Sequence, residues 1–150
     1  MKIEDEIKSK FRNEYHKALV NIYYTNNVVS QSFHKMLKEY KLTSQQFNIL
    51  RILKGQYPKA ISIGSIKERM LDKSSDVSRI INRLYMKKLI ERKECLIDRR
   101  KRDLLICKNG LELLEKIKNK MEQKEDEILS NLTIEEAKTL NVLLDKIRNK

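Results

Sequence analysis

The stretch DKSSDVSRIINRLYMKKLI, residues 72–90, combines a small polar start with an apolar pattern that repeats at helical spacing. Four apolar residues fall on one face of a predicted helix, namely Val77, Ile80, Ile81 and Leu84. Ser74 is a suitable N-cap for this helix, because its hydroxyl can accept a hydrogen bond from a backbone N–H group of the first turn. The stretch therefore predicts an amphipathic helix that packs one face into a core and leaves the other face free.

The free face of this helix carries only side chains that form hydrogen bonds. They are Ser75, Asp76, Ser78, Arg79, Asn82 and Arg83. Upstream, Thr43 and Gln46 fit a capping box, and Ser62 fits the cap of a short helix over about 63–71. Two helices joined by a short turn, with the second polar and arginine-bearing on its outer face, are typical of a helix-turn-helix.

Immediately downstream, IERKECLIDRRKRDLLICK (residues 90–108) holds two apolar-containing segments around a charged tip. We expect antiparallel strands over 90–97 and 102–108, although residues 104–106 form a continuous apolar run. The tip carries four cations in the five residues 98–102. A strand-turn-strand after a recognition helix is the wing of a winged helix. Its arginines suit the minor groove of DNA, where the negative potential is strong.

Apolar stripes continue on both sides of this region. Residues 3–39 predict one long helix or a broken pair, and residues 110–130 predict another long helix. Thr133 and Glu136 fit a capping box for a last helix. A terminal helix cannot bury its apolar stripe on itself, so these segments suggest packing against a partner chain. The predicted fold class is mainly α: a winged helix-turn-helix with a small two- or three-stranded β-wing, flanked by N- and C-terminal dimerisation helices.

The formal net charge of the 150 residues is +12, and it is unevenly distributed. Residues 61–110 carry 14 Lys and Arg against 7 Asp and Glu, whereas residues 111–150 carry 8 against 9. A polyanion, above all nucleic acid, is the natural partner of the basic part. No apolar run is long enough to cross a bilayer, and the opening residues lack the apolar core of a signal peptide. We therefore expect a cytoplasmic protein with no membrane partner.

The order of these elements resembles the MarR family (multiple antibiotic resistance regulators). LTSQQFNIL, residues 42–50, resembles the opening of the family's second helix. SSDVSRIINRLYMKKLIER, residues 74–92, resembles its recognition helix, and DRR at 98–100, twelve residues before Gly110, resembles its wing signature. The resemblance covers essentially the full chain. Each motif alone is weak, but their order and spacing together are specific.

The resemblance implies one chain, 1–150, in which 42–110 form the winged helix-turn-helix DNA-binding lobe and 1–41 and 111–150 form dimerisation helices. It implies a sequence-specific double-stranded DNA-binding transcriptional regulator, with repression as the base expectation. The regulator would act as a homodimer on a pseudo-palindromic operator. It would not be an enzyme and would need no cofactor or metal.

Many members of the family bind a small-molecule effector between the dimer helices and the DNA-binding lobe. The sequence does not identify such a ligand. Candidate pocket residues are Tyr15, Tyr23, Tyr24, Phe33, His34 and Phe47, although ordinary core packing explains each of them as well.

The resemblance also assigns DNA-contacting residues. Arg79 sits where relatives reach base edges in the major groove, and its guanidinium can bind guanine bidentately. The full recognition-helix set is Ser74, Ser75, Asp76, Ser78, Arg79, Asn82 and Arg83. Within it, Ser74 fits a cap better than a contact, Asp76 would read a cytosine amino group or orient Arg79, and an ion pair within the domain explains Arg83 equally well.

In the wing, the resemblance assigns Asp98, Arg99, Arg100 and Lys101 to DNA binding. Asp98 would brace one arginine while the other enters the minor groove. Lys101 would add a salt-sensitive attraction to phosphate. One departure from the family pattern is Lys88, at a position where relatives usually have glycine as a left-handed helix cap. We expect Lys88 either to adopt that conformation at a cost or to extend the helix.

Cys95 and Cys107 are the only cysteines, and both lie in the predicted wing strands. A pairing sum near 199 for these strands would place neither cysteine opposite the other, so redox sensing is a minority interpretation. His16 and His34 are the only histidines, and they lie too far apart along one helix to share a metal ion.

Three other classes of protein compete with the regulator. An enzyme is disfavoured because the sequence has no Gly-rich phosphate loop, HExxH motif or nucleophile elbow. A small basic RNA-binding or nonspecific nucleic-acid-binding protein is the main alternative, but it would more often show aromatics for base stacking. A purely structural helical oligomer would explain both ends of the chain but not the basic tip.

Overall fold

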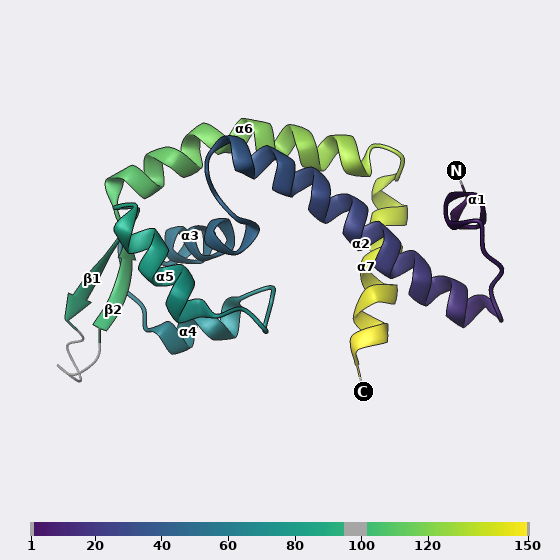
Figure 1. Ribbon diagram of the computed structural model, residues 1–150, viewed down its shortest axis with the longest axis horizontal. Helices are drawn as coiled ribbons and strands as arrows, with labels where there is room; N and C mark the ends of the chain where they lie inside the picture. Colours follow the sequence, from purple (N-terminus) through teal and green to yellow (C-terminus); the bar gives the residue numbers. More distant parts are fainter. Residues whose placement is uncertain (1, 95–101, 150) are drawn as a thin grey trace. The chain divides into compact units, whose positions relative to one another are not determined.

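The computed structural model describes residues 2–94 and 102–149. Its elements follow one another in the order α1 (Ile3–Ile7), α2 (Glu14–Glu39), α3 (Ser44–Gln56), α4 (Ile63–Arg69), α5 (Val77–Met86), β1 (Ile90–Glu94), β2 (Arg102–Ile106), α6 (Lys108–Leu129) and α7 (Ile134–Arg148) (Figure 1). The chain divides into two compact units, 1–111 and 112–150. The first unit contains the helices and strands predicted to form the winged helix.

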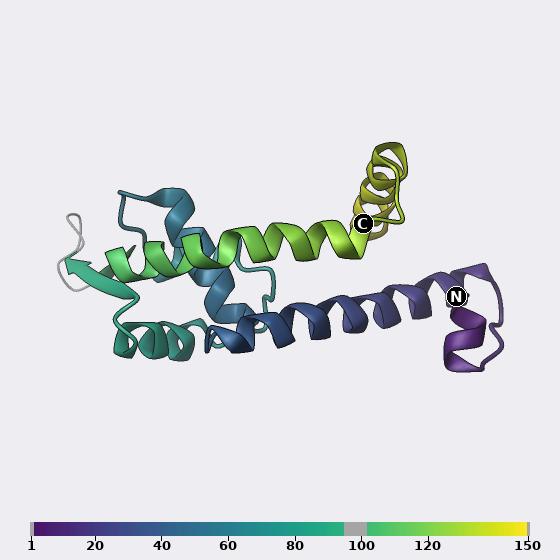
Figure 2. The same cartoon turned by 90° about the horizontal axis from the view of Figure 1, so that it is seen from above.

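The N-terminal segment is the broken pair of helices and not one continuous helix. α1 ends at Lys8, whose φ of 49° lies in the left-handed region. α2 then begins after Asn13, whose side-chain oxygen accepts a hydrogen bond from the backbone N–H of His16 at 2.9 Å. Figure 2 shows α2 as one uninterrupted helix after this break. The Asn13 cap marks the start of α2, because its side chain accepts from an N–H group of the first turn that would otherwise have no partner.

The caps predicted for α3 and α4 are confirmed. The Thr43 hydroxyl accepts from the Gln46 N–H at 3.1 Å, and Gln46 Oε1 accepts from the Thr43 N–H at 3.2 Å. Ser62 accepts from the Ser65 N–H at 3.1 Å and starts α4, which ends at Arg69, two residues earlier than expected. Each cap satisfies donors that would otherwise have no partner at a helix start.

The start of α5 corrects the sequence prediction. Asp76, and not Ser74, is its N-cap, because Asp76 Oδ1 accepts from the Arg79 N–H at 3.1 Å. The Ser74 and Ser75 hydroxyls donate instead to the carboxylate of Asp72, at 2.6 and 2.9 Å. The turn before α5 is therefore organised by Asp72, and the helix starts two residues later than a cap at Ser74 would place it, at the first residue of the apolar stripe.

The core of the first unit forms where α5 packs on α3, α4 and β1. From α5, Val77, Ile81 and Leu84 are buried, and Ile80 is half-buried, as the helical spacing predicted. Other elements contribute Ile49, Leu50 and Leu53 of α3, Ile66 of α4, and Ile90, Leu104 and Ile106 of the strands. Burial of this stripe fixes which face of α5 remains in solvent.

Like α1, the helices α2 and α5 are followed by a lysine in the left-handed conformation, and these two share one hydrogen-bond pattern. After α2, Lys41 has φ 55°, and the Leu42 and Lys41 N–H groups donate to the carbonyls of Leu37 and Lys38 at 3.1 and 2.9 Å. This pattern, together with the burial of Leu37 and Leu42, is the Schellman motif.

After α5, Lys88 has φ 57°, and the Leu89 and Lys88 N–H groups donate to the carbonyls of Leu84 and Tyr85 at 3.1 and 2.9 Å. The helix is not extended past the position where the family usually has glycine. Lys88 adopts the left-handed conformation itself, at a steric cost that glycine would not carry.

The two strands are antiparallel, with Ile90 opposite Ile106 and Glu94 opposite Arg102. β2 ends at Ile106, two residues earlier than predicted, and the predicted strand residues 95–97 lie outside the described residues. The residue numbers of each pair sum to 196 and not to 199, because Ile90 and Ile106 are both buried and pair directly. A further backbone bridge joins Ile61 to Leu104, with N–H to carbonyl distances of 3.0 and 2.8 Å. The predicted small wing sheet is thus two-stranded with one added bridge. Cys95 and the wing tip lie outside the described residues.

The C-terminal helices differ in their burial. On α6, Leu114, Ile117 and Met121 are buried, so most of its apolar seam is already covered in a single chain. α7, capped by Thr133 and Glu136 as predicted, has no buried residue, and Ile134 is 75 % exposed. The expectation of an uncovered stripe therefore holds for α7 and not for α6.

Replacement of Gly110 by alanine tests the junction between β2 and α6. A Cβ atom at Gly110 would lie 2.4 Å from the Leu89 carbonyl oxygen and 2.7 Å from Ile106 Cγ1. We expect Gly110→Ala to lower the free energy of unfolding by about 1–3 kcal/mol, because backbone must move to admit the methyl group. The measurement is urea unfolding at one fixed protein concentration.

Gly55→Ala is the matched control, because a Cβ at Gly55 in α3 meets nothing within 4 Å. It should raise the free energy of unfolding by about 0.5–1 kcal/mol, since alanine favours a helix over glycine. Equal effects of the two substitutions would show that the close approach at Gly110 is not what requires glycine there.

Candidate nucleic-acid interface

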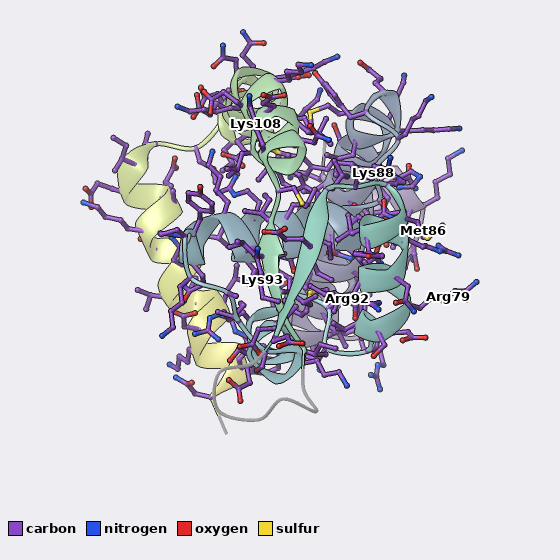
Figure 3. The ribbon with its side chains drawn as sticks, turned by 90° about the vertical axis from the view of Figure 1, so that its left-hand side faces the viewer. Arg79, Met86, Lys88, Arg92, Lys93 and Lys108 are labelled. Atoms are coloured by element: carbon purple, nitrogen blue, oxygen red, sulfur yellow. The ribbon has the colours of Figure 1, made fainter. Side chains whose placement is uncertain are left out.

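The outer face of α5 presents exposed polar side chains in a row. Ser78, Arg79, Asn82 and Arg83 are all exposed. In Figure 3, Arg79 projects from the side of α5 that lies away from the strands, and Met86 lies further along the same helix. These four polar residues are the part of the predicted recognition-helix set that the fold brings together on one surface.

The other three members of that set belong to the turn before α5. Asp76 caps the helix by accepting from the backbone N–H of Arg79. This is a different contact from the predicted bracing of the Arg79 guanidinium. Ser74 and Ser75 donate to Asp72, and these hydrogen bonds lower the pKa of the Asp72 carboxyl, with the larger effect from Ser74. Their hydroxyls are thus engaged within the turn, which they hold in place for α5.

The predicted wing contacts Asp98, Arg99, Arg100 and Lys101 lie outside the described residues. What the structure describes of the wing is the paired strand ends, β1 up to Glu94 and β2 from Arg102. On β1, Lys93 forms an ion pair with Glu91 at 3.0 Å.

Arg92 and Tyr85 form a contact between β1 and α5 that the sequence analysis missed. The Arg92 guanidinium carbon lies 4.8 Å from the centre of the Tyr85 ring, a cation–π arrangement. A guanidinium N–H of Arg92 also donates to Oδ1 of Asn82. Figure 3 shows Arg92 between β1 and α5. Strand alternation would have placed Arg92 on the sheet face of Ile90, but only the three-dimensional packing of β1 on α5 reveals what it contacts.

A second missed cluster joins the two helix ends. The Lys87 ammonium donates to the Lys41 carbonyl at 2.5 Å and to Gln46 Oε1 at 3.2 Å. Gln46 is only 3 % exposed. Its amide oxygen accepts hydrogen bonds both from the Thr43 N–H of the α3 cap and from the Lys87 ammonium. Partial burial, with the positive charges of Arg83 and Lys41, lowers the pKa of Lys87.

Beside this cluster lies an open hollow of about 570 Å³, which we call the helix-end hollow. Arg79, Asn82, Arg83 and Met86 line it from α5, and Lys41 and Lys87 line it from the helix ends. Four cationic side chains therefore surround a surface that begins at the outer face of α5. In this environment a negatively charged ligand would offset the repulsion among them.

A second hollow, of about 760 Å³, lies between α2, the start of α3 and the turn after α4, and we call it the α2–α3 hollow. Among the candidate pocket residues, His34 lines it, whereas the five aromatic candidates do not. Two of these candidates are placed clearly elsewhere: Tyr15 is 87 % exposed, and the Tyr24 hydroxyl donates to Glu6 Oε2 at 2.8 Å. The turn that borders the hollow is fixed by the Leu71 N–H, which donates to Asn48 Oδ1 at 3.0 Å.

Three further observations concern metals, thiols and membranes. Among residues 2–94 and 102–149, no group of three or more His, Cys, Asp or Glu side chains is arranged to hold a metal ion. Burial raises the pKa of the Cys107 thiol, which disfavours its reactive thiolate form. Within the same described part of the chain, no helix has the length and apolar character that crossing a membrane requires.

The sequence that forms this surface was compared with models of known protein families. Residues 42–101, from the α3 cap into the wing, match the model of the MarR family. Over these residues the chain is similar to the MarR family. The chain is also 26 % identical to the HTH-type transcriptional regulator PecS of Dickeya dadantii (strain 3937) over 121 residues. The aligned part covers 80 % of this chain and 73 % of PecS.

Solved MarR-type structures share the fold. A mutant MarR from E. coli complexed with operator DNA has a TM-score of 0.76 and 23 % identity, over 93 % of this chain and 99 % of that chain. BpsR from Bordetella bronchiseptica, whose DNA binding is regulated by 6-hydroxynicotinic acid, has a TM-score of 0.75 and 24 % identity. The match covers 89 % of this chain and 99 % of that chain. At these identities the likeness establishes the fold, and the winged helix predicted from sequence is confirmed.

Substitution of Lys88 tests the steric cost of the left-handed residue that ends α5 before the wing. Lys88→Gly should raise the free energy of unfolding by about 1 kcal/mol, because glycine adopts φ near 57° without the steric cost of a side chain. Urea unfolding at fixed protein concentration measures the change.

Lys88→Ala separates the backbone effect from the loss of a charge. Alanine has no ammonium group but keeps the Cβ atom, so it should give no comparable gain. If alanine stabilised the protein as much as glycine, repulsion at Lys88 and not its left-handed backbone would be the source of the cost.

Proposed function

We propose that the chain is a sequence-specific transcriptional repressor that binds double-stranded DNA as a homodimer on a pseudo-palindromic operator. The observation that carries this proposal is the exposed outer face of α5, where Ser78, Arg79, Asn82 and Arg83 stand together. Similarity to a family of transcription regulators supports a role that is not catalytic. Action in the cytoplasm is part of the same proposal.

The recognition helix would lie in the major groove, which is wide enough to admit an α-helix. Arg79 would read a guanine through its N7 and O6 acceptors, and Asn82 would contact a neighbouring base edge. Arg83, with Lys41 and Lys87 of the helix-end hollow, would bind backbone phosphates and fix the register of the helix. The operator complex of the E. coli MarR, which shares this fold, supports this arrangement.

The wing would follow the DNA away from α5. Its tip residues Asp98, Arg99, Arg100 and Lys101 carry three cations close to the paired strands. One arginine would enter the minor groove, with Asp98 bracing the other, and Lys101 would bind phosphate.

The homodimer would form through the terminal helices, 1–41 and 111–150. On α7, Val142 is 65 % exposed, and Leu143 and Ile147 are also exposed. On α2, Leu19 and Tyr23 are exposed in the same way. Burial of these apolar side chains against a second copy would stabilise the dimer by about 25 cal/mol for each Å² of apolar surface removed from water.

The repressor would respond to a small molecule, and the α2–α3 hollow is the candidate site for it. The hollow borders both α2 and the turn that leads into α5, so an occupant would contact the dimer arm and the support of the recognition helix together. The regulation of BpsR by 6-hydroxynicotinic acid supports an effector in a protein of this fold. The identity of the effector is not assigned.

Selection from a pool of random duplex DNA tests the proposal. Wild type should enrich a pseudo-palindrome whose half-sites are about one helical turn, 10 bp, apart. Arg79→Ala should reduce discrimination at one base pair in each half-site by about 1–3 kcal/mol, because a bidentate contact to guanine is lost. Sequencing of the selected pools and binding isotherms at one salt concentration measure both effects.

Arg51→Ala is the control, because Arg51 is an exposed arginine of α3 that lies over the Phe47 ring and belongs neither to α5 nor to the terminal helices. It should leave the selected motif unchanged. Salt-dependent binding with no enriched motif, equal for wild type and Arg79→Ala, would contradict the proposal. That result would favour a nonspecific or RNA-binding protein, which a competition between duplex DNA and structured RNA would then identify.

A further inference from the structure

Asn82 lies between two different environments on the recognition helix. On one side its amide meets the Arg92 guanidinium of β1, which donates to Asn82 Oδ1. On the other side Asn82 lines the helix-end hollow together with Arg79 and Arg83. The orientation of this amide therefore decides which hydrogen-bonding group the helix presents to a base.

The chemistry of arginine fixes that orientation. A guanidinium has only donors, so the asparagine group that faces it must be the carbonyl oxygen and not the amino group. The hydrogen bond has one charged partner, which makes it stronger than a neutral one. The Tyr85 ring, whose centre lies 4.8 Å from the guanidinium carbon, also holds Arg92 in place.

We propose that Arg92 makes Asn82 a donor-only reader of the DNA base edge. This inference rests on the DNA-binding function proposed above and deepens it. With its oxygen engaged by Arg92, Asn82 presents only its N–H groups. A free asparagine binds adenine bidentately, because it accepts from the adenine amino group while it donates to N7. The oxygen of the oriented Asn82 is turned toward Arg92, so it is not placed to accept from that amino group while the N–H groups face the base. Asn82 instead selects acceptors such as guanine O6 and N7 or thymine O4.

Arg92 is a positioning residue in this arrangement, because it acts on the base through Asn82. It also couples the wing to the recognition helix, since it belongs to β1 and its two partners belong to α5. A change in the wing strand would thereby change base preference at a position that the strand itself does not touch.

Selection from random duplex DNA with four proteins tests the inference: wild type, Asn82→Ala, Arg92→Met and the double variant. The base pair whose preference disappears in Asn82→Ala is the position read by Asn82. In wild type we expect guanine or thymine there, and not adenine. In Arg92→Met the amide is free to turn, so adenine should rise at that position by about tenfold relative to wild type. The double variant should lose this gain.

Two further variants separate orientation from charge and from folding. Arg92→Lys keeps a cation with donors only, so it should retain the wild-type preference. Tyr85→Leu loosens Arg92 without removing a charge, so adenine should rise there in the same direction and by less. Thermal unfolding of each variant verifies that it is folded, and Tyr85→Leu carries the test if Arg92→Met does not fold.

Three results would overturn the inference while leaving the repressor intact. They are adenine as the wild-type preference at the Asn82-dependent position, an unchanged preference in Arg92→Met, and no position affected by Asn82→Ala. An absence of any motif enriched by wild type would instead overturn the proposed function, and this inference with it.

Discussion

The surface of α5 depends on a tie between two helix ends. α2 and α5 both finish in Schellman motifs, and Lys87 at the end of α5 donates to the Lys41 carbonyl at the end of α2. The same ammonium donates to Gln46, whose amide caps α3. One lysine thus joins three helices at a single point, and its charge loses part of its hydration there. The lowered pKa of Lys87 reflects this loss of hydration and the repulsion from Arg83 and Lys41. An anionic partner at this surface would therefore offset that repulsion.

A single division of α5 explains both the fold and the proposed function. Its inner residues Val77, Ile81 and Leu84 are buried in the core, which leaves Arg79 and Asn82 no direction but outward. The strands add a second constraint, because Arg92 crosses from β1 to Asn82. Helix and wing are therefore connected by side chains as well as by the chain itself. A base-reading surface needs this rigidity, since contacts to base edges depend on the placement of individual atoms.

The sequence predicted the fold class and most helix starts, because those depend on local patterns. The Thr43–Gln46 capping box and the inward stripe of α5 are examples, and Arg79 was correctly expected on the outer face. The prediction of Ser74 as the cap of α5 is wrong. Three adjacent polar residues, 74–76, all fit a cap by residue type, and only the hydrogen bonds of the folded turn show that Ser74 bonds to Asp72 while Asp76 caps the helix. The roles of Lys87 and Arg92 were missed, since both act on residues that are distant in sequence or on another element. No local pattern encodes such contacts.

The central claim is that the outer face of α5 lies in the major groove of a two-fold DNA site, and methylation interference tests it most directly. Dimethyl sulfate modifies guanine N7 in the major groove and adenine N3 in the minor groove, so one reagent distinguishes the two surfaces. On the duplex selected by wild type, the account predicts that methylated guanine N7 blocks binding in two half-sites about 10 bp apart. Interference only at adenine N3, or at no defined position, would contradict it.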